Sequence, residues 1–370
     1  MIYLDNGATS FPKPDCVRQA VSSALLTCGN PGRGGYKASM NASRVVYDCR
    51  EKVADFFGAD PEQVVFTSNC THGLNIAIKA LVKPGRRVVV SGFEHNAVIR
   101  PLTALNAKVI VAGTKLFDPQ DTIDSFEAAL RGGADAAVFT HISNVFGYIL
   151  PVEELSALCT RYGVPFIVDA AQSAGVYPIH LQKLGASYIA APGHKGLLGP
   201  QGTGVLLCND LPDPILYGGT GSNSESAEMP LFLPDRLEAG TLNVPGIAGL
   251  AAGISFLKHR GIEEIAYREA KEAARCGDFL LRKGFTAFCG NTQSGTVSFV
   301  CDDCEDFAEK LSEAGISVRA GLHCAPLAHR SAGTLDTGTV RISFGHSASK
   351  YQSLKLMEAI DSIFRIHKKF

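Results

Sequence analysis

A single lysine, Lys195, lies in a segment at residues 190–204 that also contains five glycines and two prolines. Glycine permits backbone conformations and close approaches that other residues cannot make, so the segment is suited to hold this lysine in one place. A desolvated lysine amine is nucleophilic and forms Schiff bases with carbonyl compounds. The alternative is a glycine-rich turn that happens to carry a lysine, and the segment alone leaves both open.

An acidic residue, Asp169, follows the apolar run at residues 166–168. A carboxylate in that setting is costly without a cationic partner. One such partner is the protonated pyridine nitrogen of pyridoxal phosphate, because this pairing turns the cofactor into an electron sink. A helix cap or a structural hydrogen bond is the alternative for a lone aspartate at a strand end.

Other polar residues also follow predicted strands, as Asp169 does. Residues 68–73 lead into a helical pattern, where backbone N–H groups and the Thr71 hydroxyl suit a phosphate, although an ordinary capping turn explains the same residues. Three more polar side chains follow predicted strands: His95, Asn144 and Gln172. Since an open α/β sheet binds ligands beyond the carboxyl ends of its strands, we expect these residues to surround one site.

The elements that would position these residues are seven short apolar runs separated by helical patterns. The predicted strands span residues 64–67, 88–91, 109–112, 136–141, 166–170, 187–191 and 204–208, and the helices between them include 73–82, 124–130 and 152–162. Strands of continuous apolar character that alternate with helices predict a mostly parallel sheet with both faces covered.

The chain of 370 residues is long for one hydrophobic core, so we expect two domains. Two helices, from Asp15 and from about Asn41, precede the first strand. Beyond a glycine-rich loop the pattern changes to helices at 247–257, 262–281, 306–314 and 351–366 and strands at 295–300 and 339–344. We predict a large domain at residues 15–246 and a smaller α+β domain built from residues 1–14 and 247–370.

Composition disfavours several classes of function. The formal net charge of −1 argues against nucleic acid and anionic membranes as partners. The sequence has no apolar run long enough to cross a bilayer and no secretion signal at its N-terminus, so we expect a cytoplasmic protein.

Eleven scattered cysteines are expected to be mostly reduced and buried. Cys301 and Cys304 have metal or redox spacing, but no second Cys/His pair with zinc-site spacing accompanies them. We interpret this pair as part of a surface turn and predict no metal site.

The sequences of these segments and their order along the chain resemble those of the class V aminotransferase family of pyridoxal-phosphate enzymes. Within that family they resemble the cysteine desulfurases and selenocysteine lyases. The matching segments span nearly the whole chain, at residues 3–9, 94–96, 143–147, 169–173, 193–195, 199–202, 238–241 and 319–325. The resemblance implies a pyridoxal-phosphate-dependent transferase of fold type I. Such a protein has a large domain with a mostly parallel seven-stranded sheet and a smaller α+β C-terminal domain.

The resemblance also implies which residues contact the ring of pyridoxal 5'-phosphate. Lys195 would bind the cofactor covalently, and Asp169 would hold its pyridine nitrogen. Gln172 would bond the ring hydroxyl, and His95 would stack on the ring. Lys195 and His95 are thereby expected to take part in catalysis.

For the cofactor's phosphate, the resemblance implies contacts with Thr71 and His194. Thr241 would reach the phosphate in the neighbouring subunit, which implies a homodimer with shared active sites. One departure from the family is Pro192, which stands where a serine often donates to the phosphate. Backbone groups at Cys70 or Thr71 would then have to replace that donor.

For the substrate, the resemblance implies that Asn144 and Arg341 hold a carboxylate, Arg341 by a bidentate pair. In desulfurases the cysteine that corresponds to Cys324 attacks the sulfur of substrate cysteine and leaves a persulfide and alanine. Proline and glycine on its flanks place Cys324 in a loop. The attack needs a thiolate, but His323 need not activate it, because neighbours in extended chain point apart.

We therefore expect a cysteine desulfurase that converts L-cysteine to L-alanine and passes the sulfur from Cys324 to an acceptor protein. The enzyme alternatives are a selenocysteine lyase, an aminotransferase or a cysteine sulfinate-cleaving enzyme. A buried packing role is the alternative for Cys324 itself. A scaffold or sulfur-relay partner that keeps the fold without the chemistry is the non-enzymatic alternative.

Overall fold

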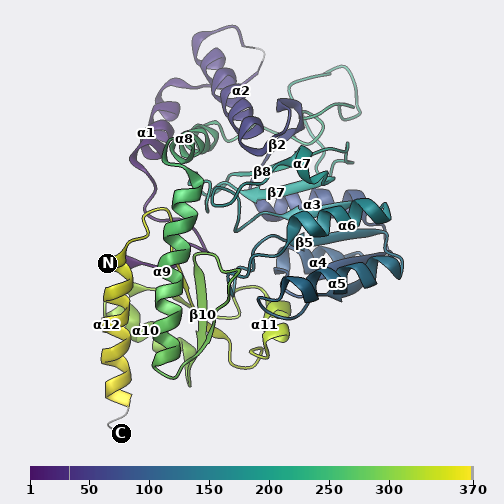
Figure 1. Cartoon of the computed structure of the whole chain (residues 1–370). Helices are drawn as coiled ribbons and strands as arrows, with labels where there is room; N and C mark the ends of the chain where they lie inside the picture. Colours follow the sequence, from purple (N-terminus) through teal and green to yellow (C-terminus); the bar gives the residue numbers. More distant parts are fainter. Residues whose placement is uncertain (33, 368–370) are drawn as a thin grey trace.

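The computed structural model describes residues 1–32 and 34–367, and its elements alternate as the sequence predicts (Figure 1). The helices are α1 (Asp15–Thr27), α2 (Lys37–Phe57), α3 (Cys70–Leu81), α4 (Asn96–Ala104), α5 (Pro119–Arg131), α6 (Val152–Tyr162), α7 (Leu181–Leu184), α8 (Val244–Arg260), α9 (Ile262–Arg282), α10 (Cys304–Glu313), α11 (Pro326–Ala332) and α12 (Lys350–His367). The strands are β1 (Ile2–Tyr3), β2 (Val64–Thr67), β3 (Arg87–Ser91), β4 (Lys108–Ala112), β5 (Ala136–Thr140), β6 (Phe166–Asp169), β7 (Tyr188–Pro192), β8 (Gly204–Cys208), β9 (Thr286–Phe288), β10 (Thr296–Val300), β11 (Ile316–Ser317), β12 (Arg319–Gly321) and β13 (Thr339–Ser343).

The main sheet has seven strands in the order β2-β8-β7-β6-β5-β3-β4, and all seven coincide with predicted strands to within one or two residues. Only the pairings of β8 are antiparallel, so the predicted mostly parallel sheet is confirmed. Neighbouring strand residues point to opposite faces. Val138 and Ile167 pack with α3 and α4 on one face, whereas Phe139 and Val168 pack with α5 and α6 on the other.

A second sheet of four antiparallel strands, β12-β13-β10-β9, packs with α9, α10 and α12 around another core (Figure 1). The start of the chain joins this part of the molecule, because β1 pairs with β11 and Leu4 lies in the same core. We propose that these elements form the smaller domain. Ile247, Leu250 and Ile254 of α8 pack in the core beside the large sheet, which favours a boundary after α8.

Two local details differ from the sequence expectations. Helix α3 begins at Cys70, three residues earlier than predicted, because the Asn69 side chain caps it by accepting the His72 N–H at 2.9 Å. The interpretation of Cys301 and Cys304 as a surface turn is wrong for Cys304, which begins α10 and is only 4% exposed. Within the described residues, no helix combines the length and apolar character that a membrane span requires.

A buried ion pair ties α2 to the loop before α8. Arg50 donates to both carboxylate oxygens of Glu238, at 3.0 and 2.8 Å, and Glu238 also accepts the Phe66 N–H at 2.7 Å. Arg50 and Glu238 are 8% and 9% exposed. The pair therefore leaves neither charge unpaired.

Replacing Glu238 with glutamine is expected to lower the free energy of unfolding by about 3–5 kcal/mol, because it leaves the Arg50 charge buried without a counterion. Chemical denaturation would measure the change. The control is Asp15→Asn, which breaks an exposed pair with Arg18 and should cost less than about 1 kcal/mol. Equal unfolding midpoints for Glu238→Gln and the unchanged protein would contradict the prediction.

Candidate active site

One pocket at the carboxyl ends of the central strands gathers most of the predicted site residues; we call it the strand-end pocket. Eight of those residues line it: Cys70, Thr71, His95, Asn144, Asp169, Gln172, His194 and Lys195. Arg341, Cys324 and Thr241 are not among its lining residues. The structure therefore brings these eight residues together in one pocket, and their roles stay predictions.

Lys195 lies in the loop after β7 and is partly buried. Burial lowers the pKa of its amine, and the nearby Arg341 guanidinium lowers it further, while Asp169 acts in the opposite direction. A lowered pKa increases the fraction of neutral, nucleophilic amine at neutral pH. The glycine-rich segment thus holds a desolvated lysine, which is what its interpretation as a Schiff-base lysine requires.

Asp169 ends β6 and is only 2% exposed. Its Oδ1 accepts the Ala171 N–H at 2.8 Å and the Cys70 thiol at 3.6 Å, and burial raises its pKa. Among the described residues Asp169 forms no ion pair, so this buried carboxylate has a place for a cationic group. A pyridinium nitrogen in the strand-end pocket meets that requirement.

His95 caps α4 at the rim of the same pocket. Its Nδ1 accepts the Ala97 N–H at 3.0 Å, which assigns the ring proton to Nε2. Burial lowers the pKa of His95 to about 4, and the Lys195 charge adds to the effect. The imidazole is therefore neutral at physiological pH and suited to stack on an aromatic ring.

The N-terminus of α3 opens into the strand-end pocket through Asn69, Cys70 and Thr71. The N–H groups of a first helical turn have no acceptor within the helix and attract anions. Pro192, opposite Gly204 at the end of β7, adds no donor. The fit to a phosphate therefore depends on the helix N-terminus and the Thr71 hydroxyl.

The start of the chain also reaches the site. Gln172 Nε2 donates to the Gly7 carbonyl at 3.0 Å, and His194 Nδ1 lies 3.0 Å from Thr9 Oγ1. Lys13 donates to the His194 carbonyl at 2.6 Å. The lysine loop is thus held by residues more than 180 positions earlier in the chain.

Arg341, on β13, is 2% exposed and is held at two of its nitrogens. Nη2 pairs with Asp5 Oδ1 at 2.5 Å, and Nη1 donates to the Asn144 carbonyl at 3.0 Å. Its Nε is buried without a hydrogen-bond partner in the described part of the chain. Sequence reasoning missed Asp5, whose only signal was its place in the matched segment at residues 3–9.

Cys324 lies in an exposed loop beside the strand-end pocket. Its carbonyl accepts the N–H of Asn96, the neighbour of His95, at 2.8 Å, and the preceding carbonyl, that of His323, accepts from Asn144 Nδ2 at 2.8 Å. Cys324 is exposed, whereas His323 is buried and points Nε2 to Thr339. The expectation that the two side chains diverge is confirmed.

Positive φ angles of 47° at His323 and 59° at Cys324 mark an unusual backbone in this loop. Non-glycine residues adopt such angles rarely, and each costs on the order of 1–3 kcal/mol unless the surroundings impose it. Here the two hydrogen bonds from α4 and Asn144 impose these φ angles on the loop. The loop therefore holds Cys324 in one position at the edge of the site.

Thr241 lies apart from the other predicted residues. It is exposed and lines a different, open depression together with Tyr47, Arg50 and Gly219. The structure of one chain does not bring Thr241 to the strand-end pocket, so its contact with a neighbouring subunit's cofactor stays a prediction.

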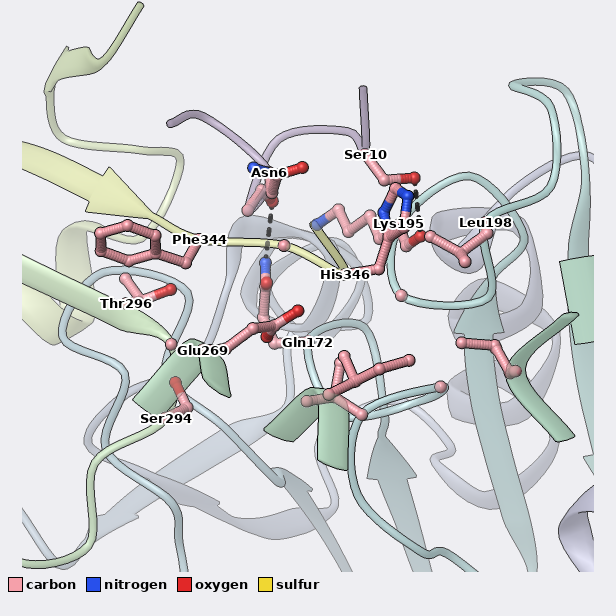
Figure 2. A pocket seen from close by; sticks show the side chains of 18 residues that line it. Asn6, Ser10, Gln172, Lys195, Leu198, Glu269, Ser294, Thr296, Phe344 and His346 are labelled. Atoms are coloured by element: carbon pink, nitrogen blue, oxygen red, sulfur yellow. Dashed lines mark hydrogen bonds between the residues drawn. The ribbon is translucent and has the colours of Figure 1, made fainter. Parts of the chain in front are cut away.

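Figure 2 shows a second pocket, which Gln172 and Lys195 line together with Glu269 from α9. Glu269 is 7% exposed and has no hydrogen bond or ion pair within the described residues, and burial raises its pKa to about 8. His346 also lines this pocket, and its Nδ1 has no partner there. Sequence reasoning missed Glu269, because nothing distinguishes it from the exposed charges of an amphipathic helix.

The raised pKa of Glu269 predicts a pH-dependent stability. The unfolded chain releases this proton near pH 4.5, whereas the folded chain keeps it to about pH 8, so stability falls as the pH rises between these values. Relative to Glu269→Gln, the unchanged protein should lose on the order of 3 kcal/mol from pH 5 to pH 8. Unfolding free energies of both proteins at the two pH values would test this.

Glu94 is also buried with a pKa of about 8, but it is present in both proteins and its contribution cancels. Glu263→Gln is the matched control, because it removes a carboxylate from an exposed position of the same helix. A constant stability difference between the Glu269→Gln variant and the unchanged protein at both pH values would contradict the prediction.

Comparison with protein families and curated proteins gives one consistent result. The family model described as aminotransferase class-V matches residues 2–353. A probable cysteine desulfurase of Pyrococcus abyssi (strain GE5 / Orsay) is 35% identical, over 97% of this chain and 92% of its own. A probable cysteine desulfurase of Methanothermobacter thermautotrophicus is 33% identical, over 98% of this chain and 94% of its own.

Solved structures agree with these relatives. The apo structure of cysteine desulfurase from Thermococcus onnurineus NA1 is 32% identical with a TM-score of 0.91, over 98% of this chain and 94% of its own. A C-DES mutant with glycine covalently linked to its PLP cofactor has the same fold, with a TM-score of 0.83 at 21% identity over 96% of this chain and 95% of its own.

Proposed function

The chain belongs to the aminotransferase class-V family and has the fold of pyridoxal-phosphate-dependent transferases of fold type I, and from this premise we propose that it is a cysteine desulfurase. It converts L-cysteine to L-alanine and transfers the sulfur to Cys324. The observation that carries the proposal is the attachment of the Cys324 loop to Asn96 and Asn144, beside the strand-end pocket that Lys195 and Asp169 line.

The described residues fit pyridoxal 5'-phosphate. Lys195 would bind it covalently, and Asp169 would supply the buried counter-charge for its ring nitrogen. The N–H groups at Cys70 and Thr71 would hold the phosphate, and the neutral His95 ring would stack on the cofactor ring. When bound, the cofactor withdraws electrons from the carbon that carries the substrate's amino group.

Separate residues of this chain bind the substrate, transfer protons and attack the sulfur. Arg341, through its unpartnered Nε, and Asn144, which lines the strand-end pocket, would hold the substrate carboxylate. The amine of Lys195, whose pKa is lowered, accepts and returns protons on the substrate. The Cys324 thiolate attacks the substrate sulfur, so that the carbon–sulfur bond breaks, a sulfur–sulfur bond forms, and the carbon gains a proton to become the methyl group of alanine. The balance is one cysteine and one thiol to one alanine and one persulfide.

We extend the proposal to a cytoplasmic homodimer that delivers sulfur to an acceptor protein. The exposed Thr241 beside an open depression supports a role toward a partner's cofactor phosphate. All eleven cysteines are free thiols, which suits a reducing compartment. The exposed Cys324 suits an acceptor that approaches the loop.

The test is to purify the protein with pyridoxal 5'-phosphate, add L-cysteine in the presence of dithiothreitol, and count the products. We expect visible cofactor absorbance that changes on adding cysteine, and equal amounts of alanine and sulfide. A keto acid formed in place of alanine would assign an aminotransferase. Much faster turnover of selenocysteine would assign a selenocysteine lyase, and a colourless protein that binds no cofactor would restore the scaffold alternative.

A further inference from the structure

Two cysteines that the proposed function does not use, Cys301 and Cys304, meet in the small domain. Cys301 directly follows β10 and is partly exposed, and Cys304 is the first residue of α10. Asp303 between them caps the helix by accepting the N–H groups of Glu305 and Asp306, both at 3.0 Å. The cap fixes the turn that joins the two cysteines.

Their sulfur atoms are in contact. The Cys301 thiol points at Cys304 Sγ at 3.8 Å, and Cys304 Sγ also lies 3.8 Å from the Cys301 carbonyl. A disulfide requires the sulfurs to approach to about 2 Å, so the 3.8 Å contact leaves only a short gap to close. The two sulfurs are therefore placed to react with each other.

The electrostatics of the pair differ from those of the other buried cysteines. The hydrogen bond from Cys301 lowers the pKa of Cys304, and the same contact raises the pKa of Cys301. Burial instead raises the pKa of Cys276, in the same core, to about 12. A thiolate at a helix N-terminus in a Cys-x-x-Cys pair is the arrangement of reactive rather than structural cysteines. In the described part of the chain no three metal-ligating side chains cluster, so the pair does not belong to a larger metal centre.

We propose that Cys301 and Cys304 form a reversible dithiol–disulfide site that exchanges with small-molecule disulfides such as glutathione disulfide. Cys301, the more exposed, attacks one glutathione sulfur as its proton passes to Cys304, and one glutathione leaves. Cys304 then attacks the Cys301 sulfur and expels the second glutathione. Two electrons pass from the protein sulfurs to glutathione disulfide, and the two glutathione thiols take up one proton from Cys301 and one from solvent.

The test uses the full chain with Cys289 replaced by serine. Trypsin cleavage after Lys283 and Lys310 then yields a peptide in which Cys301 and Cys304 are the only cysteines. The protein is incubated with glutathione disulfide, alkylated, digested and analysed by mass spectrometry. We expect this peptide to lose two hydrogen masses and to resist alkylation at both cysteines, and dithiothreitol to reverse the change.

The controls separate this site from general oxidation. Cys16 is exposed and has no cysteine in hydrogen-bond contact within the described residues, so it should carry a glutathione adduct. Adding Cys301→Ser should abolish the loss of two hydrogens. A peptide that stays fully alkylated, or that carries two separate glutathione adducts, would overturn the proposal. These outcomes are independent of the proposed function, since none of them measures cysteine turnover.

Discussion

Replacement of Lys195 with alanine should lower the turnover of L-cysteine by roughly 10³-fold or more, because it removes both the attachment point of the cofactor and the proton carrier. The effect is expected to be large because Lys195 has a lowered pKa and no other lysine lines the strand-end pocket in the described residues. The measurement is the rate of alanine formation, together with the cofactor's visible absorbance, which should shift.

Two further variants sharpen this test. Lys195→Arg keeps a positive charge but not a nucleophilic amine, so it should be as inactive as Lys195→Ala. Lys183→Ala removes an exposed lysine that pairs with Glu153 and should leave turnover unchanged. If Lys195→Ala kept more than about a tenth of the original rate, Lys195 would not be the catalytic lysine.

Replacement of Cys324 with alanine should abolish sulfide release from L-cysteine, with a loss of about 10²-fold or more, and leave the cofactor's absorbance intact. The two effects separate because Cys324 lies at the edge of the site and does not line the strand-end pocket. Sulfide and alanine assays measure the first effect, and an absorbance spectrum of the purified variant measures the second.

Cys16 provides the matched control, since it and Cys324 are the two exposed cysteines of the described chain. Cys16→Ala should release sulfide at the original rate. Mass spectrometry after a single turnover without reductant should find one extra sulfur on the peptide that contains Cys324. Full desulfurase activity in Cys324→Ala would show that another group receives the sulfur.

Most of the large sheet was predictable from the sequence, because its strands are continuous apolar runs whose ends carry polar residues. Helix α4 was not predicted: it has nine residues and contains Pro101, which interrupts the usual helical pattern. The seven-residue α11 is too short for its periodicity to be distinctive. Local patterns thus identify long, regular elements and miss short ones that tertiary contacts stabilise.

The strand-end pocket was likewise predictable from the sequence only in part. Asp169 and Gln172 follow one strand and Lys195 the next, and parallel strands bring their carboxyl ends to one edge, so the sequence predicts that these residues meet. The resemblance to a family added Arg341 and Cys324. No local pattern predicts that Asp5 pairs with Arg341, because the two residues are 336 positions apart.

The sequence by itself determined the strands of the large sheet, the polar residues at their ends and the residue types available for chemistry, since these depend on short-range periodicity. Only the tertiary structure decided which surfaces meet: the Cys324 loop with α4, Asp5 with Arg341, and Glu269 with the pocket behind Gln172. Burial and nearby charges follow from those contacts, and they set the pKa values of Lys195 and Glu269. The charge state that the chemistry needs is therefore a property of the fold, because desolvation depends on what the packed chain places around each side chain.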